Sequence, residues 1–287
     1  MGDARDAAGQ AEYWEARSSS WIEAEEYTTL ITGSFGRLAM DGLGLEPGQR
    51  VLDVGCGTGP TTMELARRVA PGGTARGVDI APSMLVAART RAERERVDNI
   101  DFVLGDAGHD DLGAGSFDAV FSQFGVMFFA DPEAAFANLR SALREGGRVG
   151  FACWQDLFAN EWMLVPGSAV VAVTGALPPM PGPGEPGPFS LADSARVDEL
   201  LQRAGFRAIE IVPHVEQVVV GADRVGEAVE AACRVGAVRE ALAQNDDPAF
   251  EDQLRSAVHA ALWDRVQDGE LRLGSAALVV SAEAGPR

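Results

Sequence analysis

The chain has 287 residues, 46% of them hydrophobic, and a formal net charge of −19. This length allows one large domain with a lid, and the charge disfavours a nucleic-acid substrate or partner, because phosphate backbones would be repelled. No apolar run approaches the roughly 18 residues of a membrane helix, and the first residues lack the pattern of a signal peptide. We therefore expect a cytoplasmic protein with no membrane partner; the composition does not indicate an oligomeric state.

The first half of the chain alternates between strand-like and helical patterns. Short apolar or β-branched runs predict strands at 50–55, 74–80, 100–106, 117–124 and 148–154. Helical spacing between them predicts helices at 60–70, 81–97 and 130–147, the second with Ser83 as a plausible N-cap. Five strands alternating with helices indicate an α/β fold, a doubly wound parallel sheet with helices on both faces.

The second half of the chain is expected to continue this fold and to cover the core. A helix is expected within 154–176, followed by a loop rich in proline and glycine at 177–188. A helix at 192–206, a strand-like run at 207–221, two amphipathic helices at about 223–243 and 248–267, and a closing strand at 271–284 complete the chain.

The stretch VLDVGCGTG, residues 51–59, ends a strand in three glycines at alternate positions. This G-x-G-x-G spacing differs from the G-x-G-x-x-G that seats a pyrophosphate, and Asp79 follows at the end of the next strand, where a carboxylate can accept two ribose hydroxyls. A nucleoside without phosphates fits this pattern. The alternative is that the glycines only permit close packing between strand and helix.

Taken together, these segments resemble those of the class I S-adenosylmethionine-dependent methyltransferases. VLDVGCGTG, GVDIAPSML, FVLGDA, FDAVFSQFGVMFF and LRSALREGGRVGFACW look like five successive motifs of that family, and outer segments such as AEYWEARSSSWIEAEE look like a bacterial small-molecule branch related to the ubiquinone and menaquinone C-methyltransferases. The resemblance implies a Rossmann-like sheet of seven strands with the last antiparallel. It also implies a helical cap at 1–45, a cofactor-binding core at 46–154, a lid at 155–190, and at 191–287 the completion of the sheet with inserted helices on the substrate side.

The resemblance assigns expected roles around S-adenosylmethionine, whose product would be S-adenosylhomocysteine. The loop glycines would approach the amino-acid head, Asp53 would support its ammonium and Asp79 would hold the ribose. Ile80 and Met84 would sandwich the adenine, with Asp106 and Ala107 beside its amine. Cys56 is interpreted as packing rather than as a nucleophile, since no neighbouring base would lower its pKa. The full expected set is Asp53, Gly55, Cys56, Gly57, Gly59, Asp79, Ile80, Met84, Asp106, Ala107 and Ser122.

The expected reaction is in-line attack on the sulfonium methyl by an O, N or activated C atom of a small, mostly apolar molecule, such as a secondary metabolite. Alignment and exclusion of water would supply most of the acceleration. His214 is the weak candidate for a base, although its place in a strand-like run beside a proline favours a structural role. Expected substrate contacts are Trp14, Trp21, Phe128, Trp154 and Trp162.

Two alternatives to this interpretation remain open. Trp14 and Trp21 are seven residues apart on an expected helix, a spacing also typical of a core stripe. A protein on the same scaffold can also bind the cofactor without transferring its methyl group, using it structurally or in a cyclisation or rearrangement.

No metal site is expected. The acids of GHDD, residues 108–111, are adjacent in a loop and do not form a converging set of oxygen ligands. Three distant cysteines without C-x-x-C spacing indicate reduced thiols and neither a disulfide framework nor a zinc site.

Overall fold

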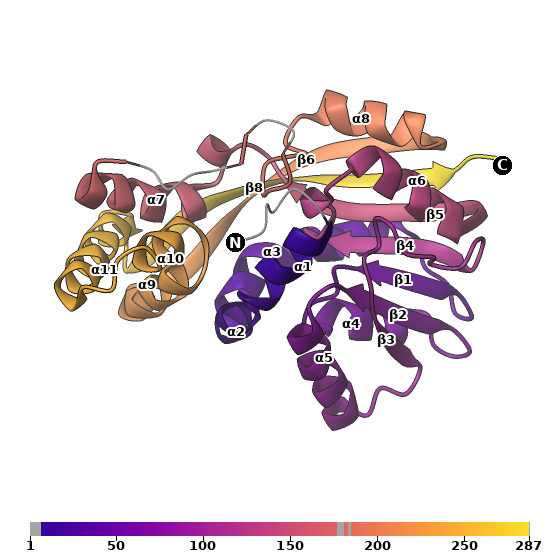
Figure 1. Ribbon diagram of the computed structural model, residues 1–287, viewed down its shortest axis with the longest axis horizontal. Coiled ribbons are helices and arrows are strands. Elements are labelled where there is room, and N and C mark those ends of the chain that lie inside the picture. The colour runs from indigo at the N-terminus through magenta and orange to yellow at the C-terminus, as the bar shows by residue number, and fades with distance from the viewer. Residues whose placement is uncertain (1–6, 177–180, 183–184, 287) are drawn as a thin grey trace.

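The computed structural model describes residues 7–176, 181–182 and 185–286. Its centre is one mixed sheet, whose strands are β1 (Arg50–Val54), β2 (Thr74–Asp79), β3 (Ile100–Leu104), β4 (Phe117–Gln123), β5 (Leu143–Trp154), β6 (Phe206–Gly221), β7 (Val266–Gln267) and β8 (Glu270–Ala284). The spatial order is β3-β2-β1-β4-β5-β8-β6, and the two-residue β7 pairs with β8 (Figure 1).

Strands β1 to β5 are parallel, whereas β8 runs antiparallel to both of its neighbours, β5 and β6. The doubly wound sheet with an antiparallel last strand is therefore confirmed, and β7 is a short addition to the seven expected strands. The order reverses between β1 and β4, and ligands of such sheets bind at the carboxyl ends of the strands near this point.

The helices surround the sheet. Their bounds are α1 (Ala7–Glu15), α2 (Ser18–Glu23), α3 (Glu25–Gly42), α4 (Pro60–Arg68), α5 (Pro82–Glu95), α6 (Pro132–Ala142), α7 (Glu161–Thr174), α8 (Ser194–Arg203), α9 (Val225–Arg234), α10 (Gly236–Leu242) and α11 (Pro248–Trp263), with 3₁₀ turns η1 (Val126–Phe128), η2 (Leu157–Ala159) and η3 (Ala222–Arg224).

Each face of the sheet is buried by helices from different parts of the chain. On one face, α3 and α4 pack on the apolar side chains of β1, β2 and β4, among them Val51 and Phe121, while α5 packs on Phe102 of β3. On the other face, α6 packs against β5 and α8 against β6 (Figure 1). This burial fixes the sheet and leaves the carboxyl ends of its strands available for a site.

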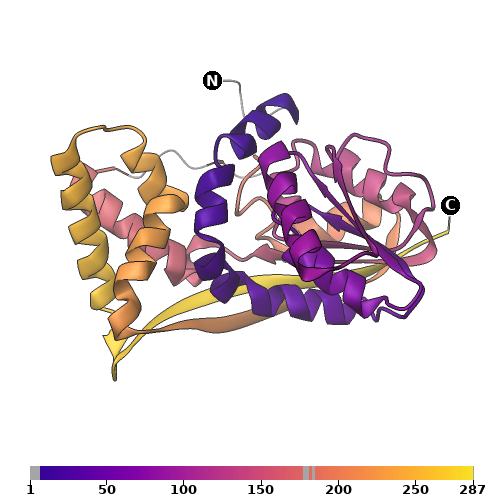
Figure 2. The ribbon, with the colours of Figure 1, turned by 90° about the horizontal axis from the view of Figure 1, so that it is seen from below.

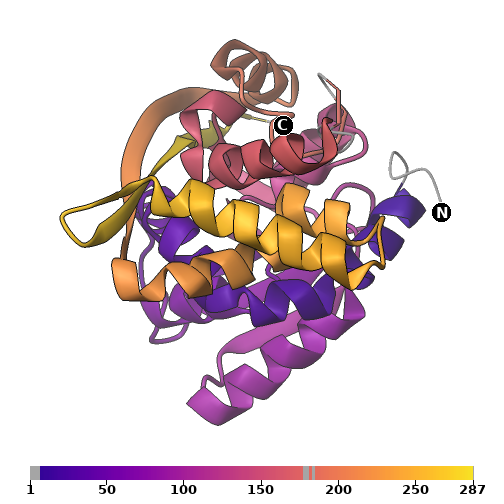
Figure 3. The same cartoon turned by 90° about the vertical axis from the view of Figure 1, so that its left-hand side faces the viewer.

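A second group of helices stands apart from the core. The long strands β6 and β8 extend from the sheet to α7, α9, α10 and α11, and the N-terminal helices α1 to α3 lie between this group and the core (Figure 2). Seen from this end, α7, α9, α10 and α11 lie in front of the rest of the molecule (Figure 3).

Several helix boundaries differ from expectation. The segment expected as one helix at 223–243 is two helices broken at Val235, and the N-terminal segment breaks between α1 and α2. Ser83 is not the N-cap of α5, because Ala81 holds that position and Pro82 begins the helix. The expected loop at 177–188 lies partly outside the described residues. Within the described part of the chain, none of the helices combines the length and apolarity needed to cross a membrane.

Candidate cofactor and acceptor site

A cavity of about 390 Å³ opens at the carboxyl ends of β1 to β5. Residues that follow these strands form its floor, helices α1 to α3 form one wall, and α7 and α10 contribute the remainder. Its volume falls within the range of small-molecule sites, and its position at the strand-order reversal is where such sheets bind ligands.

The three loop glycines have different surroundings. A Cβ on Gly55 would lie 3.1 Å from Gly125 Cα, and one on Gly59 would lie 2.8 Å from the Phe102 ring, so close packing requires both glycines. A Cβ on Gly57 would meet no atom within 4 Å. Gly55 and Gly57 line the cavity, whereas Gly59 does not. Gly59 is therefore required for close packing between strand and helix, whereas the backbone at Gly57 is open toward the cavity.

Asp79 lies at the end of β2 on the cavity wall. One carboxylate oxygen accepts the Gly57 N–H at 2.8 Å and the other accepts the Ala81 N–H at 2.9 Å. Burial raises the pKa of Asp79, and these backbone donors act in the opposite direction. The carboxylate lines the cavity, and its two oxygens offer about four acceptor positions in all, so it can accept further donors from a ligand.

Asp53 is buried behind the loop and does not line the cavity. Its Oδ2 accepts hydrogen bonds from the Thr61 and Thr62 hydroxyls, both at 2.7 Å, and Oδ1 has no partner among the described residues. Burial raises the pKa of Asp53 to about 6, while the two threonine hydrogen bonds act to lower it. Thr61, which the sequence analysis did not single out, stands between Asp53 and the cavity.

Most of the other expected cofactor residues line the same cavity, namely Cys56, Ile80, Met84, Asp106 and Ala107. The Cys56 thiol is buried, which raises its pKa and favours the packing interpretation. Ser122 is placed differently. It is buried between β4 and β1, donates to the Val54 carbonyl at 2.8 Å and accepts the Gly125 N–H at 3.2 Å, so its hydroxyl joins strands and does not face the cavity.

All five expected acceptor contacts line the cavity: Trp14, Trp21, Phe128, Trp154 and Trp162. The rings of Trp14 and Phe128 meet edge to face with centroids 4.7 Å apart, and Trp14 lies 5.8 Å from Trp21 despite the break between their helices. The rings of Trp154 and Trp162 have centroids 5.2 Å apart. The half-buried N-terminal tryptophans are therefore a wall of the cavity and not only a core stripe.

Phe124 was not among the residues expected at the site. Its backbone φ is +61°, a conformation unfavourable for a bulky residue, and its ring stacks on Trp154 at 3.8 Å. Such strain persists only where surrounding contacts fix it, commonly at functional sites. Phe124 lines the cavity directly after β4, and its place as the last residue of a predicted strand was the available signal.

Hydrogen bonds attach the N-terminal helices to the cofactor end of the cavity. Glu15 accepts from both the N–H and the hydroxyl of Ser83, at the start of α5. Glu25, at the start of α3, pairs with Arg91 and accepts from the hydroxyl of Thr58 in the glycine loop. These partners are far apart in sequence, so only the fold reveals them.

Other candidate chemistry lies away from the cavity. His214 sits on β6 and does not line the cavity, so the structure does not bring the weak base candidate to the site. His109 Nδ1 lies 3.2 Å from Asp106, and Asp110 and Asp111 accept loop N–H groups. No group of three or more His, Cys, Asp or Glu is arranged to hold a metal within the ranges described above.

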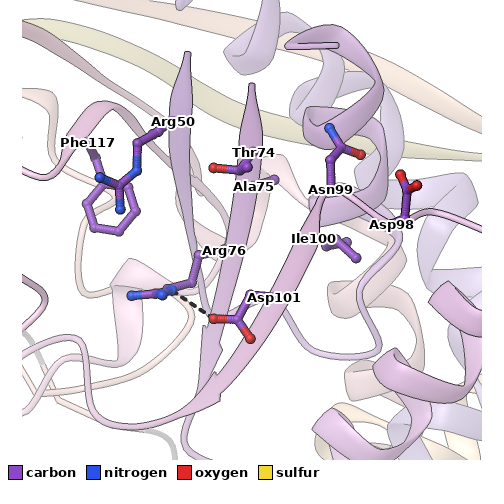
Figure 4. A pocket seen from close by; sticks show the side chains of 9 residues that line it. All are labelled: Arg50, Thr74, Ala75, Arg76, Asp98, Asn99, Ile100, Asp101 and Phe117. Atoms are coloured by element: carbon purple, nitrogen blue, oxygen red, sulfur yellow. Dashed lines mark hydrogen bonds and ion pairs between the residues drawn. The ribbon is translucent and has the colours of Figure 1, made fainter. Parts of the chain in front are cut away.

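A second hollow of about 220 Å³ lies at the opposite, amino ends of β1 to β4. There Arg76 pairs with Asp101 at 3.1 Å, and the Arg50 guanidinium lies over the Phe117 ring at 5.7 Å (Figure 4). Because ligands of doubly wound sheets bind at the other end of the strands, we assign no role in the reaction to this hollow.

Comparison with known proteins agrees with this architecture. Residues 51–147 match the model of a methyltransferase domain. The aklanonic acid methyltransferase of Streptomyces is 38% identical over 36% of this chain and 47% of its own length. A ubiquinone/menaquinone biosynthesis C-methyltransferase of Cereibacter sphaeroides is 35% identical over 42% of this chain and 50% of its own length. The chain thus spans about half the length of these curated relatives.

The fold has a counterpart among solved structures. Phosphoethanolamine N-methyltransferase 2 of Haemonchus contortus, solved with S-adenosyl-L-methionine, superposes with a TM-score of 0.60 at 19% identity, covering 100% of this chain and 61% of the other. Sheet order, glycine loop and matched domain together define a Rossmann-like nucleoside-binding protein. Residues 51–147 thus carry a methyltransferase domain, and the surrounding fold is that of a solved methyltransferase that binds S-adenosyl-L-methionine.

Proposed function

We propose that this protein transfers the methyl group of S-adenosylmethionine to an O, N or C atom of a small, mostly apolar molecule. The observation that carries the proposal is that one cavity joins two kinds of surface. Its lining includes Asp79 and the open backbone of Gly57 together with aromatic side chains such as Trp14 and Trp154. A nucleoside cofactor and an apolar acceptor could meet there.

The residues present fit the cofactor. The unpartnered, buried Oδ1 of Asp53 is an acceptor that an ammonium could satisfy through or beside Thr61, and Gly57 leaves open space for the amino-acid head. Asp79 would hold the ribose with its free lone pairs. Ile80 and Met84 would contact the adenine, with Asp106 and Ala107 near its amine. When bound, S-adenosylmethionine supplies an electrophilic methyl group on a sulfonium.

The chain's own contribution would be orientation and exclusion of water. The aromatic walls offer an apolar acceptor contact surface and keep the reacting atoms dry. Of the titratable groups on the cavity wall, Glu25 is paired with Arg91, and the pKa values of Tyr13 and Cys56 are raised, chiefly by burial. We therefore propose no dedicated general base, which favours an acceptor that is acidic or already nucleophilic.

The domain roles follow from the same arrangement. We propose that residues 46–154 hold the cofactor and that the cap at 1–45 encloses it. The described parts of 155–190 and the inserted helices of 191–287 would form the acceptor side. This assignment is supported by the lining of the cavity, where α1 to α3, α7 and α10 face the ends of the core strands.

Two measurements test the proposal. Calorimetry with S-adenosylhomocysteine should show binding to the purified protein, and absence of binding would overturn the cofactor site proposed here. Incubation of S-adenosylmethionine with a panel of aromatic acids, phenols and amines should then yield S-adenosylhomocysteine only when protein and an acceptor are both present. Binding of cofactor together with unmethylated but rearranged or cyclised products would instead establish the non-methylating alternative.

A further inference from the structure

A cluster of charged side chains lies on the otherwise mostly apolar acceptor wall. Arg17, between α1 and α2, donates to the Glu240 carboxylate of α10 at 2.8 and 3.0 Å, and Arg239 donates to the same carboxylate at 3.1 Å. All three residues line the cavity. We call Arg17, Arg239 and Glu240 the arginine cluster.

The arginine cluster carries an excess of positive charge. Two guanidinium groups share one carboxylate, and neighbouring Tyr13, whose pKa burial raises, adds no negative charge at neutral pH. Among the other acids on the cavity wall, Glu25 is neutralised by Arg91, and Asp79 and Asp106 lie at the cofactor end. A net positive corner thus occurs inside a protein whose overall charge is −19.

The two arginines differ in what they have left to offer. Arg17 uses Nε and Nη2 on Glu240 and Nη1 on the Tyr13 carbonyl, and its guanidinium lies 3.6 Å over the Tyr13 ring. Arg239 uses Nη1 on Glu240 and Nε on the Ser20 hydroxyl, whereas its Nη2 has no hydrogen-bond partner among the described residues. Arg17 is therefore held in place, whereas the Nη2 group of Arg239 can still donate hydrogen bonds to a ligand.

We propose that Arg239, oriented by Glu240 and flanked by Arg17, binds an oxyanion carried by the methyl acceptor. A single ion pair between the cap and α10 would need only one arginine, and a second, uncompensated guanidinium on an apolar wall costs desolvation unless an anion balances it. The planar fork of arginine matches a carboxylate or similar oxyanion. The inference rests on the proposed function and names its substrate class: an amphipathic molecule, apolar over most of its surface, with one acidic group.

Matched fluorescent probes test this without knowledge of the natural acceptor. 8-Anilinonaphthalene-1-sulfonate and N-phenyl-1-naphthylamine share one apolar framework and differ by the sulfonate. We expect Arg239→Gln to weaken binding of the sulfonate probe about tenfold, the loss of one charge-assisted contact, while binding of the neutral probe changes less than twofold.

The control is Arg234→Gln. Arg234 forms the same kind of pair between the helical group and the N-terminal segment, with Glu23 at 2.9 Å, but it does not line the cavity. This variant should bind both probes as the wild type does. The inference would be overturned if Arg239→Gln lost affinity equally for both probes or for neither probe. It would also be overturned if Arg234→Gln showed the same loss of affinity. The arginine cluster would then be only a structural contact between α10 and the cap.

Two further measurements separate this inference from the proposed function. If Arg239→Gln does not fold, salt replaces it: wild-type affinity for the sulfonate probe should fall between 0.05 and 0.5 M NaCl while affinity for the neutral probe does not, and parallel behaviour would overturn the inference. Calorimetry with S-adenosylhomocysteine, measured on the same samples, reports on the cofactor site alone. Binding of S-adenosylhomocysteine without discrimination between the probes would overturn only the oxyanion site.

Discussion

The Asp79 carboxylate accepts the backbone N–H of Gly57 at 2.8 Å, which joins the end of β2 to the loop after β1. Its second oxygen accepts from Ala81 at the start of α5, so one side chain fixes two backbone segments on the cavity wall. Because both oxygens are held before any ligand arrives, little ordering of the acid is needed on binding.

We expect Asp79→Asn to weaken binding of S-adenosylhomocysteine at least tenfold. An amide turns one of the two acceptors into a donor, which would face the N–H of Gly57 or Ala81 and leave a buried donor unsatisfied, a loss of about 1–3 kcal/mol. Calorimetry measures the affinity and thermal unfolding the stability. Asp101→Asn is the control, because this exposed acid on β3 pairs with Arg76 at the other end of the sheet; a similar loss there would show a general effect of charge.

Asp53 predicts a pH dependence of stability. Its pKa is about 6 in the folded protein against an ordinary 3.8, so between these values the folded state binds more protons than the unfolded state. The free energy of unfolding therefore falls as pH rises through this window, by about 1 kcal/mol from pH 5 to pH 7 for this group. Asn cannot titrate, so Asp53→Asn should lose this component.

Urea unfolding of both proteins at pH 5 and pH 7 checks the prediction. The difference in unfolding free energy between wild type and Asp53→Asn isolates this group from the other acids, because they are common to both proteins. A difference that is the same at the two pH values would contradict the assigned effect of burial on Asp53.

Glu25→Gln should loosen the N-terminal cap. The substitution replaces a half-buried ion pair with Arg91 by a neutral contact and weakens the acceptor for the Thr58 hydroxyl, a loss of roughly 1–2 kcal/mol. Hydrogen exchange across residues 7–42 should become faster than in the wild type. Glu26→Gln is the matched control, since the neighbouring Glu26 side chain is 86% exposed and pairs only loosely with Arg224 at 3.4 Å. Faster exchange in both variants would contradict a specific role for Glu25.

The sheet and the cofactor loop were predictable because their signals are local. Apolar runs, proline at helix starts and glycines at a strand end are set within a few residues, and β1 to β5 follow them. Asp79 was predictable because it ends a strand beside the loop. The helix break between Trp14 and Trp21 was not, because Arg17, which lies at the break, bonds to Glu240, 223 residues away in sequence.

Three of the expected cofactor residues face the protein interior for a common physical reason. Asp53, Gly59 and Ser122 belong to the motifs, but the strand pleat and the turn direct them into the protein, where they bond to Thr61, pack on Phe102 and join Val54. Alternation of side chains along a strand decides which motif residues face a ligand. His214 lies on β6 at the edge of the sheet and away from the cavity, in agreement with the structural or edge role that its strand-like run beside a proline favours.

Alanine should affect mainly stability at Gly59 and mainly cofactor binding at Gly57. Gly59 has a φ of +85°, and a Cβ there would lie 2.8 Å from the Phe102 ring and 3.0 Å from Ala88, both buried, so Gly59→Ala should lower the unfolding free energy by roughly 3 kcal/mol. Gly57 has a φ of +53° and open space around it, so Gly57→Ala should cost only about 1 kcal/mol of stability.

The effect of Gly57→Ala should fall on binding instead, because its methyl group would occupy the space proposed for the amino-acid head of the cofactor. We expect affinity for S-adenosylhomocysteine to drop more than tenfold, measured by calorimetry on protein shown to be folded by circular dichroism. Wild-type affinity in Gly57→Ala would remove Gly57 from the ligand contact. Equal stability losses in the two variants would contradict the division of the loop into a packing glycine and a binding glycine, since that division requires the methyl group to meet protein at one position and open space at the other.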